Sequence, residues 1–218
     1  MSSSQENVPE LSGFKRFRKE WIEPVFVALI LVVIIRTFIF QPFRIPSGSM
    51  EDTLLVGDQL IAIKFLYGIK IPFNGKRIFK IRDPKPGDVI VFKFPDDPSK
   101  KFIKRCIASG GQHVEIREKV VYVDGVEQKP PEHVKFMDPY IYPANPDSHR
   151  DNLEEFVVPE DSFFMMGDNR DNSNDSRFWG FVPDENILGK AFILYWSWNS
   201  EALLLQKVRW ERLFNLIR

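Results

Sequence analysis

The chain has 218 residues, enough for one sizeable folded domain and a shorter additional segment. Lys plus Arg and Asp plus Glu each number 30, so the net charge is near zero. That balance argues against a nucleic-acid-binding protein, which usually carries a basic excess. The 20 Phe and 5 Trp residues are ample for a hydrophobic core, and the single cysteine excludes an internal disulfide without indicating a redox compartment.

An apolar run within the first 40 residues predicts a membrane anchor. A polar tail, residues 1–13, leads into a basic cluster over residues 15–19, and the apolar run then extends from Trp21 to Phe40. Its length matches the roughly 20 residues that span a bilayer, and Arg36 lies near enough to the end for its side chain to reach the headgroups. The positive-inside rule places the basic cluster in the cytoplasm and the rest of the chain outside.

Two other structures fit so short a run. A cleaved signal peptide has a similar charge layout, but no small-residue cleavage site closes the run. A buried core helix is the second alternative. The anchor is the better prediction, and it divides the chain into a cytoplasmic basic tail, a transmembrane helix and an extracytoplasmic domain, over residues 1–20, 21–40 and 41–218.

Beyond residue 41 the helical period largely disappears, and short apolar segments with turn signals predict a mainly β domain. Asp124-Gly125 is a strong two-residue hairpin signal between two of these segments. The predicted strands cover residues 59–64, 89–92, 101–108, 120–126, 162–166 and 187–196.

Two stretches of this domain depart from the strand pattern. Residues 129–152 contain five prolines and predict a loop-rich insertion or subdomain over about 119–156. Residues 201–218 interleave apolar and basic side chains. The sequence leaves two alternatives for them, a helix that closes the domain or a basic amphipathic segment lying on anionic lipid.

The stretch Ile45–Leu54 follows the predicted anchor closely and carries two serines, Ser47 and Ser49, around Gly48. A hydroxyl on a glycine-containing turn beside a membrane exit indicates a reactive group held at the bilayer surface. Serine is a poor nucleophile until a base accepts its proton. The usual base is histidine, but no motif accompanies the 3 histidines, so a Ser-His-Asp triad is neither excluded nor supported.

Lys104 is the best candidate for a different base, because a lysine can accept a proton when burial lowers its pKa. In the strand over residues 101–108, alternation places Lys104 on an apolar face with Phe102, Cys106 and Ala108. The plainer alternative is a solvated edge-strand lysine. By the same alternation Cys106 is either a small core residue or a modifiable thiol beside the site.

A second dense polar stretch, residues 167–180, predicts a rigid hydrogen-bonded loop that buttresses a site. Its spaced Asp and Asn residues resemble a calcium loop, but the positions of the required glycine and glutamate hold Ser176 and Val182. We therefore expect an ion pair between Asp175 and Arg177 in its place. A plain structural turn is the alternative.

Four motifs taken together resemble bacterial type I signal peptidases, the membrane-anchored Ser/Lys proteases that remove signal peptides from exported proteins. Each motif alone is weak, but all four in this order behind an anchor are highly specific. The resemblance runs from the anchor to the last strands. It rests on Pro46-Ser47-Gly48-Ser49-Met50 with Thr53-Leu54 and Gly57-Asp58, on Pro86 to Phe92, on Phe102-Ile103-Lys104-Arg105, and on Gly167 to Arg177 with Trp179-Gly180.

The resemblance implies a role for each matching position. Ser49 matches the nucleophile and Lys104 the general base. Ser47 matches the hydroxyl that joins the Ser49 N–H in an oxyanion hole, and Ser173 matches a hydroxyl that orients the lysine. Asp175 and Arg177 match the pair that supports this site. Four apolar positions match those that line pockets for small side chains at the first and third positions before the cut: Phe43, Ile45, Leu54 and Ile103.

Three positions sit uneasily with this pattern. Ile103 needs a twist or bulge to line the pocket, because strict alternation turns it away from Lys104. Asp52 stands where the family usually has proline, which puts the stiffness of the serine turn in question. Gln112 stands where the family often has aspartate, so we expect that loop to be built differently.

The resemblance implies an endopeptidase that cleaves preproteins after small residues of the Ala-x-Ala type, without a cofactor or metal. Its partners would be preproteins and the lipid bilayer, not nucleic acid. It would lie in the bacterial inner membrane, near the secretion translocon, with its N-terminus cytoplasmic. The rivals are a membrane-anchored Ser/Lys protease of different specificity and a non-catalytic anchored β-domain that binds peptides.

Overall fold

The computed structural model describes residues 16–70, 77–143, 149–203 and 206–218. The chain forms two compact units, residues 1–39 and 40–218. In the first, one helix runs over Arg18–Ile39. Its centre, α2 (Glu23–Ile34), is α-helical, and π-helical turns flank it at Arg18–Ile22 and Ile35–Ile39.

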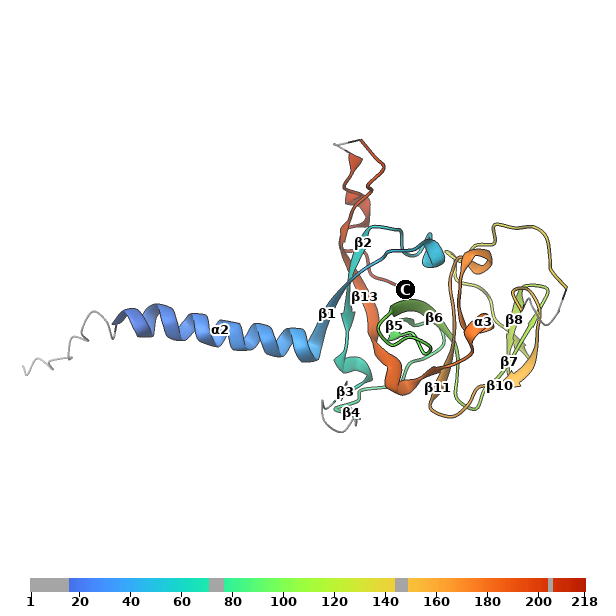
Figure 1. Cartoon of the computed structure of the whole chain (residues 1–218), viewed down its shortest axis with the longest axis horizontal. Coiled ribbons are helices and arrows are strands. Elements are labelled where there is room, and N and C mark those ends of the chain that lie inside the picture. The colour runs from blue at the N-terminus through green and yellow to red at the C-terminus, as the bar shows by residue number, and fades with distance from the viewer. Residues whose placement is uncertain (1–15, 71–76, 144–148, 204–205) are drawn as a thin grey trace, which may run out of the picture. The chain divides into compact units, whose positions relative to one another are not determined.

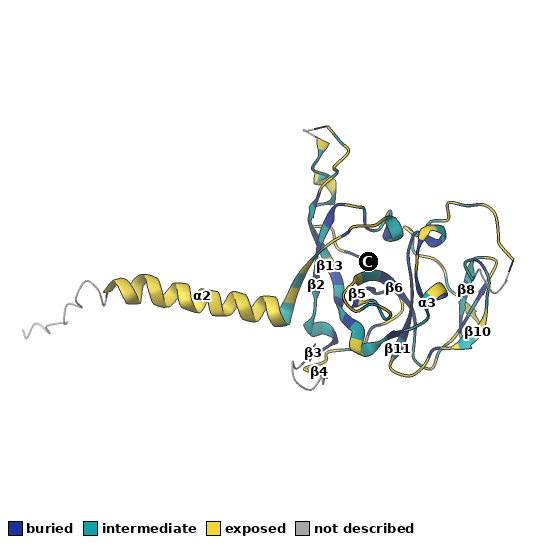
Figure 2. Cartoon of the chain, in the orientation of Figure 1, coloured by how far each residue is buried: buried dark blue, intermediate teal, exposed yellow. Residues whose placement is uncertain are grey.

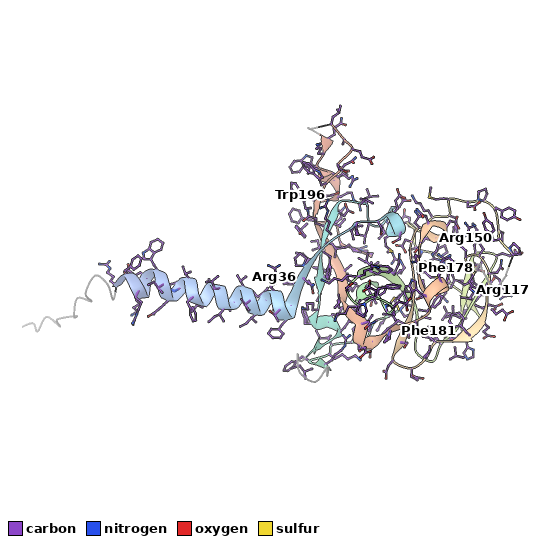
Figure 3. The ribbon with its side chains drawn as sticks, in the orientation of Figure 1. Arg36, Arg117, Arg150, Phe178, Phe181 and Trp196 are labelled. Carbon is purple, nitrogen blue, oxygen red and sulfur yellow. The ribbon has the colours of Figure 1, made fainter. Side chains whose placement is uncertain are left out.

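The apolar residues of this helix are exposed from Trp21 to Ile35 (Figure 2). None of its residues is buried by protein, so the alternative of a buried core helix is wrong. A helix that is apolar all round and long enough to cross a bilayer is typical of a membrane span. Within the described ranges it is the single helix of that length and hydropathy, and Arg36 lies in its last turn (Figure 3).

The second unit is built on a seven-stranded antiparallel sheet that curls around its own core (Figure 1). Its strand order is β1-β2-β13-β5-β6-β11-β12, so strands far apart in the sequence lie side by side. The strands are β1 (Phe40–Arg44), β2 (Asp58–Ile63), β5 (Val89–Lys93), β6 (Lys101–Ser109), β11 (Ser162–Met166), β12 (Val182–Pro183) and β13 (Ile187–Ser197).

Two smaller sheets complete the unit. One has the order β10-β7-β8-β9, with strands β7 (His113–Arg117), β8 (Val120–Val123), β9 (Val126–Glu127) and β10 (Leu153–Val157). The other pairs β3 (Ile69–Lys70) with β4 (Arg77–Ile78). Short helical turns lie at η3 (Gly48–Met50), η4 (Phe65–Tyr67), η5 (Arg170–Asn172), α3 (Ser176–Trp179), η6 (Asp184–Asn186) and η8 (Trp210–Arg212).

The predicted mainly β fold is confirmed. The six predicted strand regions coincide with β2, β5, β6, the β8–β9 hairpin, β11 and β13. Asp124 and Gly125 have φ values of 51° and 74°, which is the left-handed conformation that a tight hairpin turn of this type requires. The described parts of the predicted loop-rich stretch, residues 129–143 and 149–152, contain no named helix or strand.

Apolar side chains from both faces of the main sheet form its core. On β5, Val89 and Val91 pack in one cluster, and Ile90 and Phe92 pack in another. This strand is therefore buried on both sides, as its unbroken apolar sequence requires. A third cluster, which includes Val114 and its neighbours, joins β11 to the four-stranded sheet.

The alternative of a closing helix over residues 201–218 is wrong for the part of that segment that the structure describes. The segment returns along β13 in extended form, with bridges from Val208 to Trp198 and from Leu216 to Ile193. Backbone bonds link the segment to β13, as from Phe214 to Leu194 and from Ile217 to Phe192, and its local backbone bonds form isolated turns such as η8 rather than a helix. Trp196, labelled in Figure 3, stacks edge-on against Trp210 of the returning segment.

Strict alternation also fails along β6. Phe164 and Met165 of β11 pair with Ala108 and Cys106, so Ile107 has no opposite residue and forms a bulge. Cys106 stays in the cluster of Phe102, but Ala108 packs elsewhere, so the prediction that Ala108 shares a face with Lys104 is wrong. Cys106 is fully buried among apolar side chains, which fits the small core residue among its two alternatives.

Candidate active site

The segment that connects β1 to β2, residues 45–57, carries Ser47 and Ser49 and is called the serine turn. Ile45 donates its N–H to the Asp58 carbonyl at 2.9 Å and accepts from Gly57 at 3.0 Å, so the neck of the turn is closed by two backbone bonds. Beyond the neck, η3 carries Ser49 at its centre, and Met50 is fully buried beneath it. Burial of the methionine fixes the turn to the core and leaves the Ser49 side chain on the outer side.

Lys104 reaches this serine from β6, where it pairs with Ile90 of β5. Its Nζ lies 2.5 Å from Ser49 Oγ and 3.1 Å from Ser173 Oγ, across separations of 55 and 69 residues. The lysine is only 3% exposed, so the alternative of a solvated edge-strand lysine is wrong. The structure thus brings the predicted base into contact with both the predicted nucleophile and the predicted orienting hydroxyl.

The environment of Lys104 shifts the amine toward its neutral form. Burial lowers the pKa of Lys104 to about 8, with Asp175 opposing the shift and Arg177 adding to it. Burial disfavours an ammonium because it removes the water that solvates the charge. The amine has no carboxylate within salt-bridge distance in the described chain, and its two closest polar partners are hydroxyl groups.

The loop after β11 holds Ser173 against the lysine. Asp175 caps α3 by accepting from the Arg177 N–H, and its carboxylate also receives the Gly167 N–H at 2.9 Å. The predicted pair of Asp175 with Arg177 is present at 2.8 Å, with both side chains buried. Although burial alone would raise the pKa of Asp175, Arg177 holds it below its usual value. This pair fixes the loop without touching Ser49.

Gly167 is required by close approach. A Cβ at this position would collide with Ser173 Oγ and would lie 2.5 Å from the carbonyl oxygen of Ser49. The backbone of the loop after β11 therefore contacts the backbone of the serine turn close to Lys104, Ser49 and Ser173.

Sequence reasoning assigned no role to a cluster of three residues next to Ser49: Thr53, Arg105 and Asp168. Asp168 receives two hydrogen bonds from Arg105, at 2.8 and 2.6 Å, and one from the Thr53 hydroxyl at 2.6 Å. Arg105 is the residue after Lys104 on β6. Its ion pair with Asp168, together with the Thr53 hydrogen bond, therefore joins β6, the serine turn and the loop after β11. All three residues belong to the quoted motifs, but a motif does not say which of its members pair across 115 or 63 residues.

Asn169 is the second position that sequence reasoning missed. Its N–H donates to the Ser49 carbonyl at 3.1 Å, and its Nδ2 donates to the Gly48 carbonyl and to Glu51 Oε2, both at 3.2 Å. The residues on either side of Asn169 bond to Lys135: the Asp168 carbonyl accepts from the Lys135 N–H, and the Arg170 N–H donates to the Lys135 carbonyl, both at 3.0 Å. The loop is therefore clamped between the serine turn and the loop-rich stretch.

A cleft of about 530 Å³ opens beside Ser49. The unpaired edge of β6 forms one wall, since β11 pairs with β6 only from Arg105 onward. Ser47 lies exposed at the other wall, and its side chain makes no capping bond to η3. The cleft is lined by Pro46, Ser47, Gly48, Ser49, Lys101, Phe102, Ile103, Lys104, Asn172 and Asn174.

The four predicted pocket residues are placed differently from one another. Of the twist or bulge that we expected at Ile103, the bulge is absent, because the β5–β6 pairing is regular there, and Ile103 nevertheless lines the cleft. Ile45 and Leu54 are buried in the apolar cluster that also holds Met50, and Phe43 packs against that cluster. The assignment of these four residues to a substrate pocket stays a prediction.

Asp52 does not simply replace a proline. Its φ is 76°, a left-handed conformation that the proline ring, with φ near −65°, cannot adopt. Asp52 and Glu51 both contact Lys135, at 3.3 and 3.2 Å, so the turn gains a link to the loop-rich stretch. These carboxylates are largely exposed, and such pairs typically contribute less than ~1 kcal/mol.

The loop after β6 is closed by Gln112. Its Oε1 accepts from the Ser109 N–H at 3.0 Å and from the Ser109 hydroxyl at 3.1 Å, and its Nε2 donates to Asp124 at 3.0 Å. The longer side chain thus ties this loop to the turn of the β8–β9 hairpin.

Comparison with known proteins identifies the class of protein that carries this site. The model of the family described as signal peptidase, peptidase S26, matches residues 18–196. Signal peptidase I of Pseudomonas aeruginosa is 36% identical over 89% of this chain and 80% of its own length, and that of Pseudomonas fluorescens is 38% identical over 84% and 74%. Signal peptidase I of Enterococcus faecalis V583 aligns structurally at a TM-score of 0.40 and 29% identity, over 50% of this chain and 97% of its own.

The matches define a serine endopeptidase, a hydrolase of the peptidase S26 class. The family model spans most of the chain, and the chain covers more than two thirds of the Pseudomonas relatives. The chain belongs to the signal peptidase family.

The packing at Gly167 yields a test of the site's construction. We expect Gly167→Ala to lose about 1–3 kcal/mol of unfolding free energy, the usual range for overpacking, because the new methyl group would meet Ser173 and the Ser49 backbone. Urea unfolding monitored by tryptophan fluorescence measures the loss. Gly48→Ala is the matched control, since its Cβ would make an ordinary 3.6 Å contact with Glu51. Equal stability of the two variants would contradict the close approach.

Proposed function

We propose that this signal peptidase cleaves its substrates with Ser49 as nucleophile and Lys104 as general base. The observation that carries the proposal is the 2.5 Å separation of Lys104 Nζ and Ser49 Oγ within a buried environment. A neutral amine at hydrogen-bond distance accepts the serine proton as the hydroxyl attacks a peptide carbonyl. The lysine pKa of about 8 supports this role, because a useful fraction of the amine is then neutral near pH 7.

The reaction proceeds through an acyl-enzyme. Ser49 Oγ bonds to the carbonyl carbon, and Lys104 passes the proton that it received to the departing amine of the mature chain. A water molecule then gives its proton to Lys104 and attacks the ester, and the released proton returns to Ser49. Ser47 and the Ser49 N–H are the proposed oxyanion donors, and each such donor typically contributes about 2.7–4 kcal/mol.

Two features support the proposed oxyanion hole. Ser47 is exposed at the cleft wall and its hydroxyl is not used in capping η3. Ser49 is the middle residue of a single three-residue turn, and N–H groups at the start of a helical turn have no acceptor within it. Ser173, Asp175 and Arg177 are proposed to orient the base, with Ser173 acting directly on Lys104 Nζ.

The substrate is proposed to lie as an extended strand in the cleft. The unpaired edge of β6 at Lys101–Lys104 offers main-chain groups on one side, and Pro46–Ser49 bounds the other side. Main-chain pairing would set the register, and small apolar pockets would select small side chains before the cut, of the Ala-x-Ala type. Phe43, Ile45, Leu54 and Ile103 are the proposed sources of that selectivity.

The chain is membrane-anchored, and we propose the apolar run predicted over residues 21–40 as its single span, except that the helix ends at Ile39 and Phe40 already belongs to β1. Lys15, Arg16, Arg18 and Lys19 favour a cytoplasmic N-terminus, so residues 41–218 lie outside, with an insertion at about 119–156. The proposed location is the bacterial inner membrane, near the translocon, where signal peptides leave the bilayer. Anchoring there raises the effective concentration of substrate at the site.

The dyad is tested by single substitutions in the purified, detergent-solubilised chain. We expect Ser49→Ala to abolish cleavage of a preprotein after Ala-x-Ala, and Lys104→Met to lower kcat/KM by at least about 10²–10⁴-fold, the range for loss of a general base. Lys93→Met removes an exposed lysine at the end of the neighbouring strand and is expected to keep full activity. Gel electrophoresis of the processed product, with unfolding curves to show that each variant folds, measures the outcome. Substantial activity in either dyad variant would exclude the assignment.

The proposed orientation is tested by cysteine labelling. We expect Glu127→Cys, at an exposed position of β9, to react with a membrane-impermeant maleimide in intact spheroplasts, because this strand lies in the proposed extracytoplasmic domain. The native Cys106 is buried and is not expected to react. Labelling of the new cysteine only after the membrane is broken would contradict the orientation.

A further inference from the structure

A second cavity, of about 200 Å³, lies away from the serine and lysine. Its walls come from β6, from the turn before β5, and from the segment that follows β9. The volume far exceeds the ~10–15 Å³ that one water molecule needs. Its lining residues are Pro86, Gly87, Arg105, Cys106, Ile107, Val121, Gln128, Lys129, Pro130, Pro131 and Arg170.

Arg170 is the unusual member of this lining. It is only 4% exposed, and within the described residues its guanidinium makes no salt bridge, while its Nε has no hydrogen-bond partner. Only its backbone groups are engaged, with Lys135 and with Arg177. A buried charged group with an unpaired donor is disfavoured, so an anion from outside the chain that bonded to this guanidinium would stabilise the folded state.

The carboxylates nearby are already committed. Asp168 is held by Arg105 and Thr53, and Asp175 is held by Arg177. Three guanidinium groups therefore share two carboxylates in this interior cluster. Burial first, and then repulsion from Arg177, lowers the pKa of Arg170 to about 10, which agrees with an unmatched positive charge.

The rest of the cavity fits a single anion held mainly by Arg170. Arg105 can add at most one N–H, because four of its five guanidinium donors already bond to Asp168, the Gly87 carbonyl and the Arg218 carbonyl. Three lining residues are prolines, which have no N–H to offer. Lys129 is exposed and supplies a second positive charge.

We propose that this cavity binds a small tetrahedral oxyanion, phosphate or sulfate, through the guanidinium of Arg170 with Lys129 as a second contact. The planar fork of an arginine suits two oxygens of such an ion. The bound ion would join β6, the segment over residues 128–131 and the loop that carries Ser173. The inference does not depend on the chemistry of Ser49 and Lys104.

The test uses the full chain in neutral detergent, with inorganic phosphate compared with chloride at equal ionic strength. An ion that binds only the folded state raises Tm with its concentration. We expect phosphate to raise the Tm of the wild type by several degrees, to leave Arg170→Gln unchanged, and to act more weakly on Lys129→Ala. Arg117→Gln removes an exposed arginine of β7 and is the matched control, which should respond like the wild type. An equal response in Arg170→Gln would overturn the proposal.

Two further measurements separate binding from a merely structural role of Arg170. Without phosphate or sulfate, Arg170→Gln is expected to melt at or above the Tm of the wild type, because it removes an unmatched buried charge. A much lower Tm would mean that the guanidinium is already satisfied, and would overturn the proposal. Stabilisation by phosphatidylglycerol in mixed micelles, with none by free phosphate, would mean that Arg170 and Lys129 bind a lipid headgroup. That result would overturn the proposed site for a free anion.

Discussion

Removal of water from one amine is the constraint on which the site depends. An exposed lysine with a pKa near 10.4 has about one neutral molecule in a few thousand at pH 7, whereas a pKa of about 8 leaves roughly one in ten neutral. The protein achieves this by burying Lys104 between β5 and the loop after β11, with hydroxyl groups as its direct partners. A carboxylate in direct contact would restore the charge, so Asp175 is kept on Arg177 and acts on the lysine only through space.

The ion pairs next to the site hold Lys104, Ser49 and Ser173 in fixed positions relative to one another. The ion pair of Arg105 with Asp168 joins β6 to the loop after β11, and the hydrogen bond from Thr53 to Asp168 joins the serine turn to both. Both charged groups are buried, so the pair adds little net stability, but removal of either partner would leave an uncompensated charge. The pair is therefore best understood as a device that fixes the relative positions of three segments. Gly167 allows these segments to approach as closely as the 2.5 Å contact of Lys104 with Ser49 requires.

Much of this architecture follows from local sequence signals. Periodicity and turn residues located the strands around Asp124-Gly125, and the motifs predicted the contacts among Ser49, Lys104 and Ser173. These local signals do not predict which segments pair over long distances in the sequence. The apolar and basic residues near Leu216 fit a helix equally well, and only the backbone groups of β13 decide that they pair as an extended segment. The bulge at Ile107 depends on the register of β11, and the roles of Asp168 and Asn169 depend on partners more than 60 residues away.

The central claim is that a neutral Lys104 removes the proton from Ser49, and the pH dependence of kcat/KM tests it most directly. This quantity reports the ionisation of groups in the free enzyme. Because the base must be deprotonated, kcat/KM should fall tenfold per pH unit as the pH drops below the lysine pKa, and it should level off above a midpoint of about 8. A midpoint near 10.4, the value of a free lysine, would show that burial does not shift the amine, and one near 6.5 would point to a histidine; either result would contradict the account.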